Sequence, residues 1–182
     1  MSAVERAAEL RRRAVATGAA GQPVRAARML HRALDLLPAS SAAPVRAVRA
    51  RILASLAYFE AEQGHVDHGL GLLDEAEVLA ADLDNPSLRG NLHVQRGSIL
   101  VRRGAMELAL EHLDQAVRLL DGSFEDQCAT LLNRSALHLY SGNLPAADTD
   151  LHQCLDIATR NGLGVLREIG RASCRERVLR LV

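Results

Sequence analysis

Residues 101–117 read VRRGAMELALEHLDQAV, and the single glycine at position 104 divides them into two runs of helix-forming residues. After this glycine, Ala109, Leu113 and Ala116 follow one another at separations of four and three, which place them on one face of the second helix. Another small residue, Gly97, stands seven positions before the glycine, in the first helix. Small side chains let two helices approach closely, so the stretch predicts a pair of packed helices joined by a glycine turn.

The same arrangement occurs around three other glycines, Gly21, Gly64 and Gly142. A small residue stands seven positions before each glycine and five and twelve positions after it, and a leucine stands nine positions after it. The matching residues are Ala14, Ala26, Leu30 and Ala33; Ala57, Gly69, Leu73 and Ala76; and Ser135, Ala147, Leu151 and Cys154. Successive glycines are 43, 40 and 38 residues apart, so the sequence predicts a repeat array.

This pattern resembles the tetratricopeptide (TPR) repeat, and Pro38 stands where the first unit would close. The resemblance implies an all-α, right-handed superhelical solenoid of about four helix hairpins. The expected units are 3–38, 44–82, 86–120 and 124–160. Because the spacing exceeds the usual value of about 34 residues, we expect longer helices or linkers than in the family consensus.

Apolar residues at helical spacing and end signals predict eight helices, with a ninth starting near Val165. Asn85 before Pro86 is expected to cap one helix, and Ser123 with Asp126 resembles a capping box. The predicted helices are 3–18, 23–37, 44–63, 66–82, 86–103, 105–120, 124–141 and 144–160.

Composition excludes several classes of protein. Aromatic residues make up only 2% of the 182, which disfavours a β-sandwich. The formal net charge is +0, so composition gives no support for a nucleic acid or acidic membrane partner. No apolar run reaches about 18 residues, and the charged start is not a signal peptide. Three cysteines without a CxxC pair fit a reducing cytoplasm.

No constellation of catalytic residues, cofactor motif or metal cluster stands out, so we expect no enzyme activity in this chain. His65 and His68 are three residues apart, but no cysteine or carboxylate cluster completes a metal site, and a solvated helix start is expected. Cys154 occupies a small-residue position and is expected to be a packed core thiol. The arginines at 11–13 are expected to form a solvated helix face.

A binding surface is the better candidate for function. Stacked TPR units line a concave surface with the first helix of each unit. By resemblance, ten residues are expected to face this surface: Arg51, Tyr58, Glu62, Asn91, Val94, Ser98, Arg102, Leu132, Asn133 and Tyr140. Tyrosine and arginine are frequent anchors of protein interfaces. The expected ligand is a protein or peptide.

The chain changes character at Glu168–Val178, which read EIGRASCRERV and resemble a translated sequencing adapter. We therefore expect 168–182 to be a non-native tail that belongs outside functional reasoning, and the repeat array to be cut off after Arg167. Residues 179–182 do not continue the match. The helix at 144–160 would then lack its successor, so Leu151, Leu155 and Ile157 should be only partly covered, and the chain should self-associate artefactually through this end.

Two segments resemble the repeat region of actinobacterial proteins that carry a C-terminal CHAT domain, a caspase-like protease module. They are residues 51–77 and 131–163. The resemblance implies that this chain regulates a protease that would follow Arg167. Two alternatives stay open, namely the repeat segment of an NTPase-type transcriptional regulator and a free-standing TPR adaptor.

Overall fold

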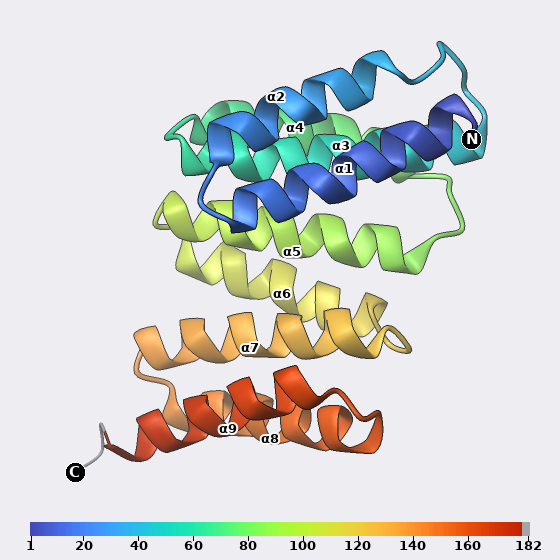
Figure 1. Ribbon diagram of the computed structural model, residues 1–182. Coiled ribbons are helices and arrows are strands. Elements are labelled where there is room, and N and C mark those ends of the chain that lie inside the picture. The colour runs from blue at the N-terminus through green and yellow to red at the C-terminus, as the bar shows by residue number, and fades with distance from the viewer. Residues whose placement is uncertain (180–182) are drawn as a thin grey trace.

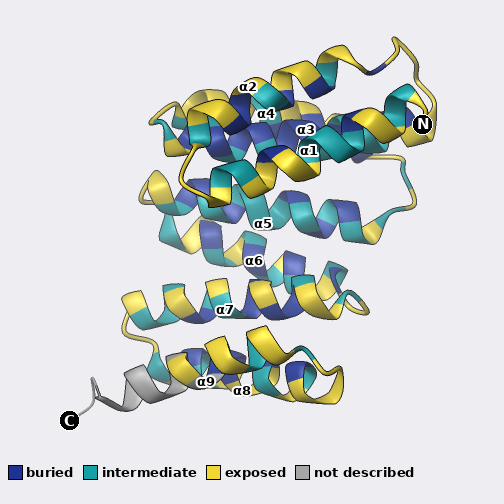
Figure 2. Ribbon diagram, in the orientation of Figure 1, coloured by how far each residue is buried: buried dark blue, intermediate teal, exposed yellow. Residues whose placement is uncertain are grey.

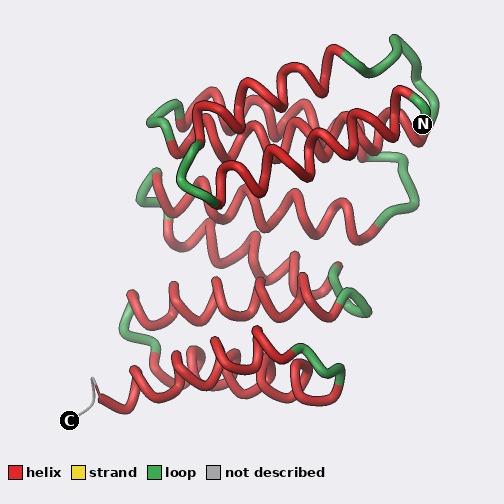
Figure 3. The backbone as a smooth tube through the Cα atoms, viewed as in Figure 1, coloured by secondary structure: helices red, strands yellow, loops and turns green. Residues whose placement is uncertain are grey.

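The chain folds into stacked α-helices, as the computed structural model shows (Figure 1). The structure describes the backbone of residues 1–179 and the side chains of residues 1–170 and Ala172. Within this part it contains helices and loops but no strand (Figure 3). The helices are α1 (Ala3–Ala19), α2 (Pro23–Asp35), α3 (Ala43–Glu62), α4 (Val66–Ala80), α5 (Pro86–Arg102), α6 (Met106–Leu119), α7 (Phe124–Tyr140), α8 (Leu144–Arg160) and α9 (Gly164–Leu179).

Each predicted hairpin turn is built on a glycine with a positive φ. The φ angles of Gly21, Gly64, Gly104 and Gly142 are 79°, 93°, 81° and 75°. Residues with a Cβ rarely adopt this left-handed conformation, which ends the first helix of the pair and reverses the chain. The four anchoring glycines of the sequence pattern are therefore confirmed as turn residues.

One of the two predicted caps is confirmed and the other is wrong. The Asn85 side chain accepts a hydrogen bond from the backbone N–H of Leu88 at 2.9 Å. The Ser123 hydroxyl instead donates to the carboxylate of Asp126 at 3.0 Å and caps no helical N–H. A capping box that was not predicted joins Ser2 and Glu5 at the start of α1.

Helices α1 and α2, α3 and α4, α5 and α6, and α7 and α8 pack as pairs, and each pair packs on the next (Figure 1). Gly97 shows why the contact positions must be small. A Cβ at Gly97 would lie 3.1 Å from Cγ of Leu113 and 3.3 Å from the carbonyl oxygen of Ala109, both on α6. Gly97 is thus confirmed as a close contact between α5 and α6.

Buried residues lie between the layers of the stack, and exposed residues lie on its outer faces (Figure 2). One core cluster joins α1, α2 and α3, a second joins α3, α4 and α5, and a third joins α7 and α8. Cys154 belongs to the third cluster and is fully buried, as expected for a core thiol. Burying one leucine side chain contributes about 1.5–3 kcal/mol, so such clusters stabilise each pair of helices.

A repeated ion pair joins neighbouring units. Arg96 and Arg134 each lie eight residues before a turn glycine, and each binds an aspartate ten residues after the preceding turn glycine. Arg96 contacts Asp74 at 2.7 Å, and Arg134 contacts Asp114 at 2.6 Å. The same register therefore fixes how α5 sits on α4 and how α7 sits on α6.

The end of the stack differs in part from the expectation. Leu151 was expected to be partly covered, but it is fully buried because its own hairpin encloses it. Leu155 and Ile157 are half-buried, and Leu155 contacts α9, where a Cβ at Gly170 would lie 3.0 Å from its Cδ2 atom. The side chains of Arg171, Cys174, Arg175, Arg177, Val178 and Leu181 lie outside the described residues.

Among the described residues, no helix has both the length and the apolar character needed to cross a membrane.

Candidate functional site: a groove lined by the first helix of each unit

A groove runs across the first helices of the four units, α1, α3, α5 and α7. Its middle is a cavity of about 530 Å³ lined by both apolar and polar residues. The lining residues are Val15, Gly18, Ala19, Ser55, Tyr58, Phe59, Glu62, Val94, Gln95, Ser98 and Asn133. They come from all four first helices, so the cavity exists only because these helices are stacked.

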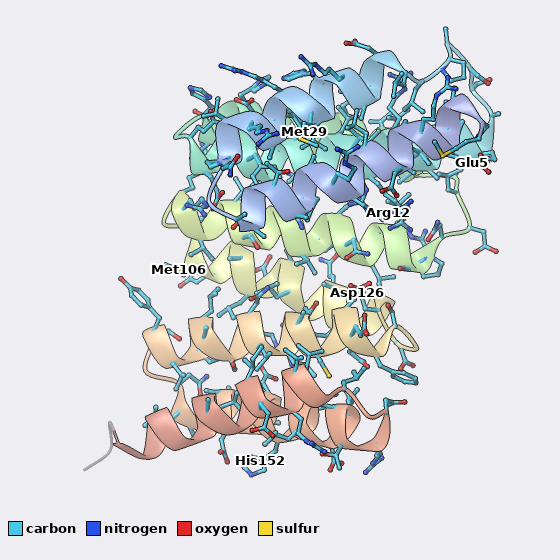
Figure 4. All side chains as sticks on the ribbon, in the orientation of Figure 1. Glu5, Arg12, Met29, Met106, Asp126 and His152 are labelled. Atoms are coloured by element: carbon cyan, nitrogen blue, oxygen red, sulfur yellow. The ribbon has the colours of Figure 1, made fainter. Side chains whose placement is uncertain are left out.

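Two further cavities extend the groove. One, of about 240 Å³, shares Ser55 and Gln95 with the middle cavity. It is lined by Arg11, Arg51, Ala54, Ser55, Leu88, Asn91, Leu92, Gln95 and Asp126, the last of which Figure 4 labels near the start of α7. The other, of about 350 Å³, shares Tyr58, Ser98 and Asn133 with the middle cavity. It is also lined by Gly97, Val101, Arg102, Leu113, Ala136 and Leu137. Below, "the groove" means these three cavities together.

The groove brings together most of the residues predicted from the sequence. Those that line it are Arg51, Tyr58, Glu62, Asn91, Val94, Ser98, Arg102 and Asn133. Their position in the groove makes these residues available to a ligand. That they contact a ligand stays a prediction.

Two of the predicted residues lie elsewhere. Leu132 packs against the core cluster that contains Cys128 and Leu131. One step along a helix turns the side chain by about 100°, so Leu132 faces the core while its neighbour Asn133 faces the groove. Tyr140 is the last residue of α7; its side chain is 81% exposed and lines none of the three cavities. It shares the face of Asn133, but it lies where α7 ends.

A cluster of three side chains fixes the wall between α3 and α5. The Tyr58 hydroxyl donates to Oε1 of Glu62 at 3.0 Å, and a guanidinium nitrogen of Arg102 donates to the same oxygen at 3.0 Å. The guanidinium carbon of Arg102 lies 5.6 Å from the centroid of the Tyr58 ring. Because these contacts hold all three side chains in the free protein, less conformational entropy is lost when a ligand binds.

Several groove residues were missed in the sequence. They are Arg11, Val15, Gly18, Ala19, Ala54, Ser55, Phe59, Leu88, Leu92, Gln95, Gly97, Val101, Leu113, Asp126, Ala136 and Leu137. The arginines at 11–13 were expected to be solvated together, but this is wrong for Arg11, which is half-buried and donates to the Ser55 hydroxyl at 3.3 Å.

The repeat register could have identified the missed residues of the first unit. Arg11 stands three residues before Ala14, as Val94 stands three before Gly97. Val15 follows Ala14 as Ser98 follows Gly97. Extending the predicted groove positions to α1 would therefore have placed both residues on the concave surface.

The described part of the chain offers few groups for metal binding or nucleophilic catalysis. No group of three or more histidine, cysteine, aspartate or glutamate side chains that could hold a metal ion occurs there. His65 contacts a carboxylate oxygen of Glu60 at 2.8 Å. Cys128 is buried, and burial raises the pKa of its thiol, so the thiolate form is disfavoured.

No protein-family profile matches the chain, and no curated protein matches it. Several solved structures are similar to it. The chain is similar to the apo form of RapI, with a TM-score of 0.70 and 14% identity over 87% of this chain and 58% of that one. It is also similar to a Podosopora anserina kinesin-light-chain-like protein with nearly identical TPR-like repeats, with a TM-score of 0.63 and 18% identity over 88% of this chain and 78% of that one.

These similarities establish the fold. The chain is an all-α, TPR-like superhelical repeat, as the sequence predicted. It spans less than two thirds of the length of RapI.

Proposed function

We propose that the chain is a protein-interaction repeat and that its groove binds a peptide segment of a partner protein. The observation that carries the proposal is the continuity of the groove across four helices from four units. Packed helices lie roughly 10 Å apart, so the two steps from α1 to α3 and from α3 to α5 cover about 20 Å, and the groove continues from there to α7. An extended peptide of at least about six residues spans the first two steps.

The lining of the groove fits such a ligand. Apolar lining residues such as Val94 and Phe59 would cover apolar side chains, and the polar groups of Asn133 and Ser98 would meet backbone amides. The rigid cluster of Tyr58, Glu62 and Arg102 would act as an anchor. TPR-like solenoids expose a concave surface of this kind, which supports a role in protein binding.

Panning a phage library of random peptides of about 12 residues on the 182-residue chain tests the proposal. Enriched peptides should bind the purified chain, and Tyr58→Ala should weaken them by roughly tenfold or more. The matched control is Val78→Ala, since Val78 is 74% exposed on α4, away from the groove. Failure to enrich any peptide, or equal effects of the two substitutions, would refute the proposal.

The wider role that we propose is regulatory. The resemblance to CHAT-domain proteins supports a repeat segment that controls a caspase-like protease in the cytoplasm. An NTPase-type regulator and a free-standing adaptor are the alternatives. Sequencing the uninterrupted gene past codon 167 tests all three. A His and Cys protease domain there would favour the first, a Walker motif or a DNA-binding helix-turn-helix the second, and an early stop the third. The same sequencing also tests whether 168–178 derive from an adapter.

A further inference from the structure

Two arginines share one end of the groove. Arg11 from α1 and Arg51 from α3 both line the cavity of about 240 Å³. Ser55 links them: its hydroxyl accepts a hydrogen bond from Arg11 at 3.3 Å and donates one to the backbone carbonyl of Arg51 at 3.0 Å. The pKa of Arg11 is lowered, first by burial and then by the positive charges of Arg51 and Arg12. Two like charges are thus held close together.

These two arginines differ from four others in the described part of the chain that reach a neighbouring element. Arg96, Arg102 and Arg134 each pair with a carboxylate from another helix, and Arg46 pairs with Asp82 in the turn that follows α4. Within the described residues, neither Arg11 nor Arg51 forms an ion pair, and the Arg51 guanidinium donates no hydrogen bond. Guanidinium groups make their strongest contacts with carboxylates, in a bidentate geometry. The cavity therefore presents two guanidinium groups that form no ion pair with the described part of the fold.

The net charge of the cavity favours an anion with a single negative charge. Asp126, which also lines it, carries one negative charge against the two positive charges of Arg11 and Arg51. The excess is one positive charge, which one carboxylate would neutralise. A phosphate group carries more charge and would face repulsion from Asp126. The balance favours an aspartate or glutamate side chain.

A buried amide group beside the arginines points to a peptide backbone. Gln95 lines both this cavity and the middle one, and its Oε1 atom is buried without a hydrogen-bond partner in the described part of the chain. An unsatisfied buried acceptor costs about 1–3 kcal/mol, and a rotation of the Gln95 side chain toward the cavity would let a backbone N–H of a bound peptide remove that cost.

We propose that Arg11 and Arg51 form an anion subsite that takes the carboxylate of an acidic residue, while Gln95 hydrogen-bonds the adjacent peptide backbone. The proposal rests on peptide binding in the groove. Alternate side chains of an extended peptide point the same way, so an apolar residue two positions away would enter the adjoining middle cavity, over Val94 and Phe59. The groove would thus select an acidic residue and an apolar residue with one residue between them.

The peptides enriched on the 182-residue chain test this subsite. A fluorescein-labelled consensus peptide should contain Asp or Glu two positions from an apolar residue. Arg11→Gln and Arg51→Gln should each weaken its binding, measured by fluorescence anisotropy, by roughly tenfold or more, as expected for a lost charge-assisted hydrogen bond. Arg28→Gln, at an exposed arginine on α2, is the matched control and should leave the affinity unchanged.

A change in the peptide keeps the test independent of protein folding. Replacing the acidic residue by its amide should weaken binding to the unaltered chain by the same factor, and should have little further effect on the Arg51→Gln chain. If enriched peptides lack acidic residues, or if the arginine variants bind normally while Tyr58→Ala does not, the subsite is wrong and peptide binding stands. If no peptide is enriched, both fail. If inorganic phosphate displaces the peptide more strongly than acetate at equal ionic strength, the carboxylate assignment is overturned.

Discussion

Arg134 on α7 holds the buried carboxylate of Asp150 on α8 with two hydrogen bonds, of 2.9 Å from Nε and 2.6 Å from a terminal nitrogen. The Asp150 side chain is only 3% exposed, and Arg134 also contacts Asp114 on α6. One arginine therefore joins three helices of two consecutive units.

Replacing Arg134 by alanine should destabilise the chain by about 3–5 kcal/mol, because it leaves the Asp150 carboxylate buried without its arginine partner and with the His138 imidazole 4.0 Å away. Urea denaturation measures the change. Arg160→Ala is the matched control, since Arg160 and Asp156 form an exposed pair within α8 whose loss should cost less than about 1 kcal/mol. Similar midpoints for the two variants would show that α7 and α8 do not depend on the buried pair.

Gly97→Leu should destabilise the chain by about 1–3 kcal/mol or more, because even a Cβ at this position would crowd Leu113 and Ala109 of α6. Gly71→Leu is the control. A Cβ at Gly71 would meet nothing within 4 Å, so the loss of a helical glycine should leave stability unchanged or slightly raised. Equal denaturation midpoints for the two variants would mean that the register of α5 against α6 is wrong.

Two histidines on neighbouring helices predict that stability falls at acid pH. The Nδ1 atoms of His93 and His112 lie 2.9 Å apart. Burial lowers the pKa of both imidazoles below the ordinary value of 6.5, and nearby positive charge lowers it further. The pKa of His93 is lowered by the positive charges of His112 and Arg96, with a smaller effect of Arg118, and that of His112 is lowered by Arg96. The carboxylate of Glu77 opposes the shift at both rings, and Glu111 also opposes it at His112.

The sign follows from proton binding. Below pH 6.5 the unfolded chain binds more protons at these two sites than the folded chain does, so stability is greatest above 6.5 and falls as the pH drops toward the lowered pKa values. Urea midpoints at about pH 7.5 and about pH 5.5 measure the fall. The double variant His93→Gln, His112→Gln should reduce it, whereas His152→Gln, at an exposed site, should not. An undiminished fall in the double variant would assign the pH dependence to other groups.

Deleting 168–182 should change the free energy of unfolding by no more than about 1 kcal/mol. Of the described side chains in this segment, Ile169 is 45% exposed, and the buried residue, Gly170, has no side chain to bury. The intact chain should also self-associate with rising concentration, through the half-buried Leu155 and Ile157 at this end. Sedimentation over a hundredfold range of concentration tests the second expectation. A strictly monomeric chain that unfolds without the segment would make 168–182 part of the fold.

The repeat pattern was sufficient to predict the fold because the residues that repeat are those that the turns and the contacts between helices require. The turn glycines require a left-handed backbone, and positions such as Gly97 must be small, so both can be recognised in the sequence. The eight predicted helices start within one residue of the observed ones and end within two. The cap at Ser123 was wrong because the carboxylate of Asp126, which was expected to complete a capping box, accepts a hydrogen bond from the Ser123 hydroxyl instead.

The groove was less predictable because exposure depends on neighbouring helices. Arg11 belongs to a run of three arginines that looks uniformly solvated; the repeat register separates it from the other two only when the groove positions are extended to α1, and the contact with Ser55 of α3 then holds it. Leu132 and Asn133 are adjacent in sequence, yet one faces the core and the other the groove. The ion pairs of Arg96 and Arg134 follow the repeat register, but recognising them requires knowing which helices pack together.

The most direct test of the groove is to locate a bound peptide on the chain. An enriched peptide in which benzoylphenylalanine replaces the apolar residue can be photocrosslinked to the 182-residue chain, and mass spectrometry then identifies the labelled segment. Binding in the groove predicts crosslinks to α1, α3 and α5, around the middle cavity lined by Val15, Phe59 and Val94. Crosslinks confined to α2, α4 or α6 would contradict it.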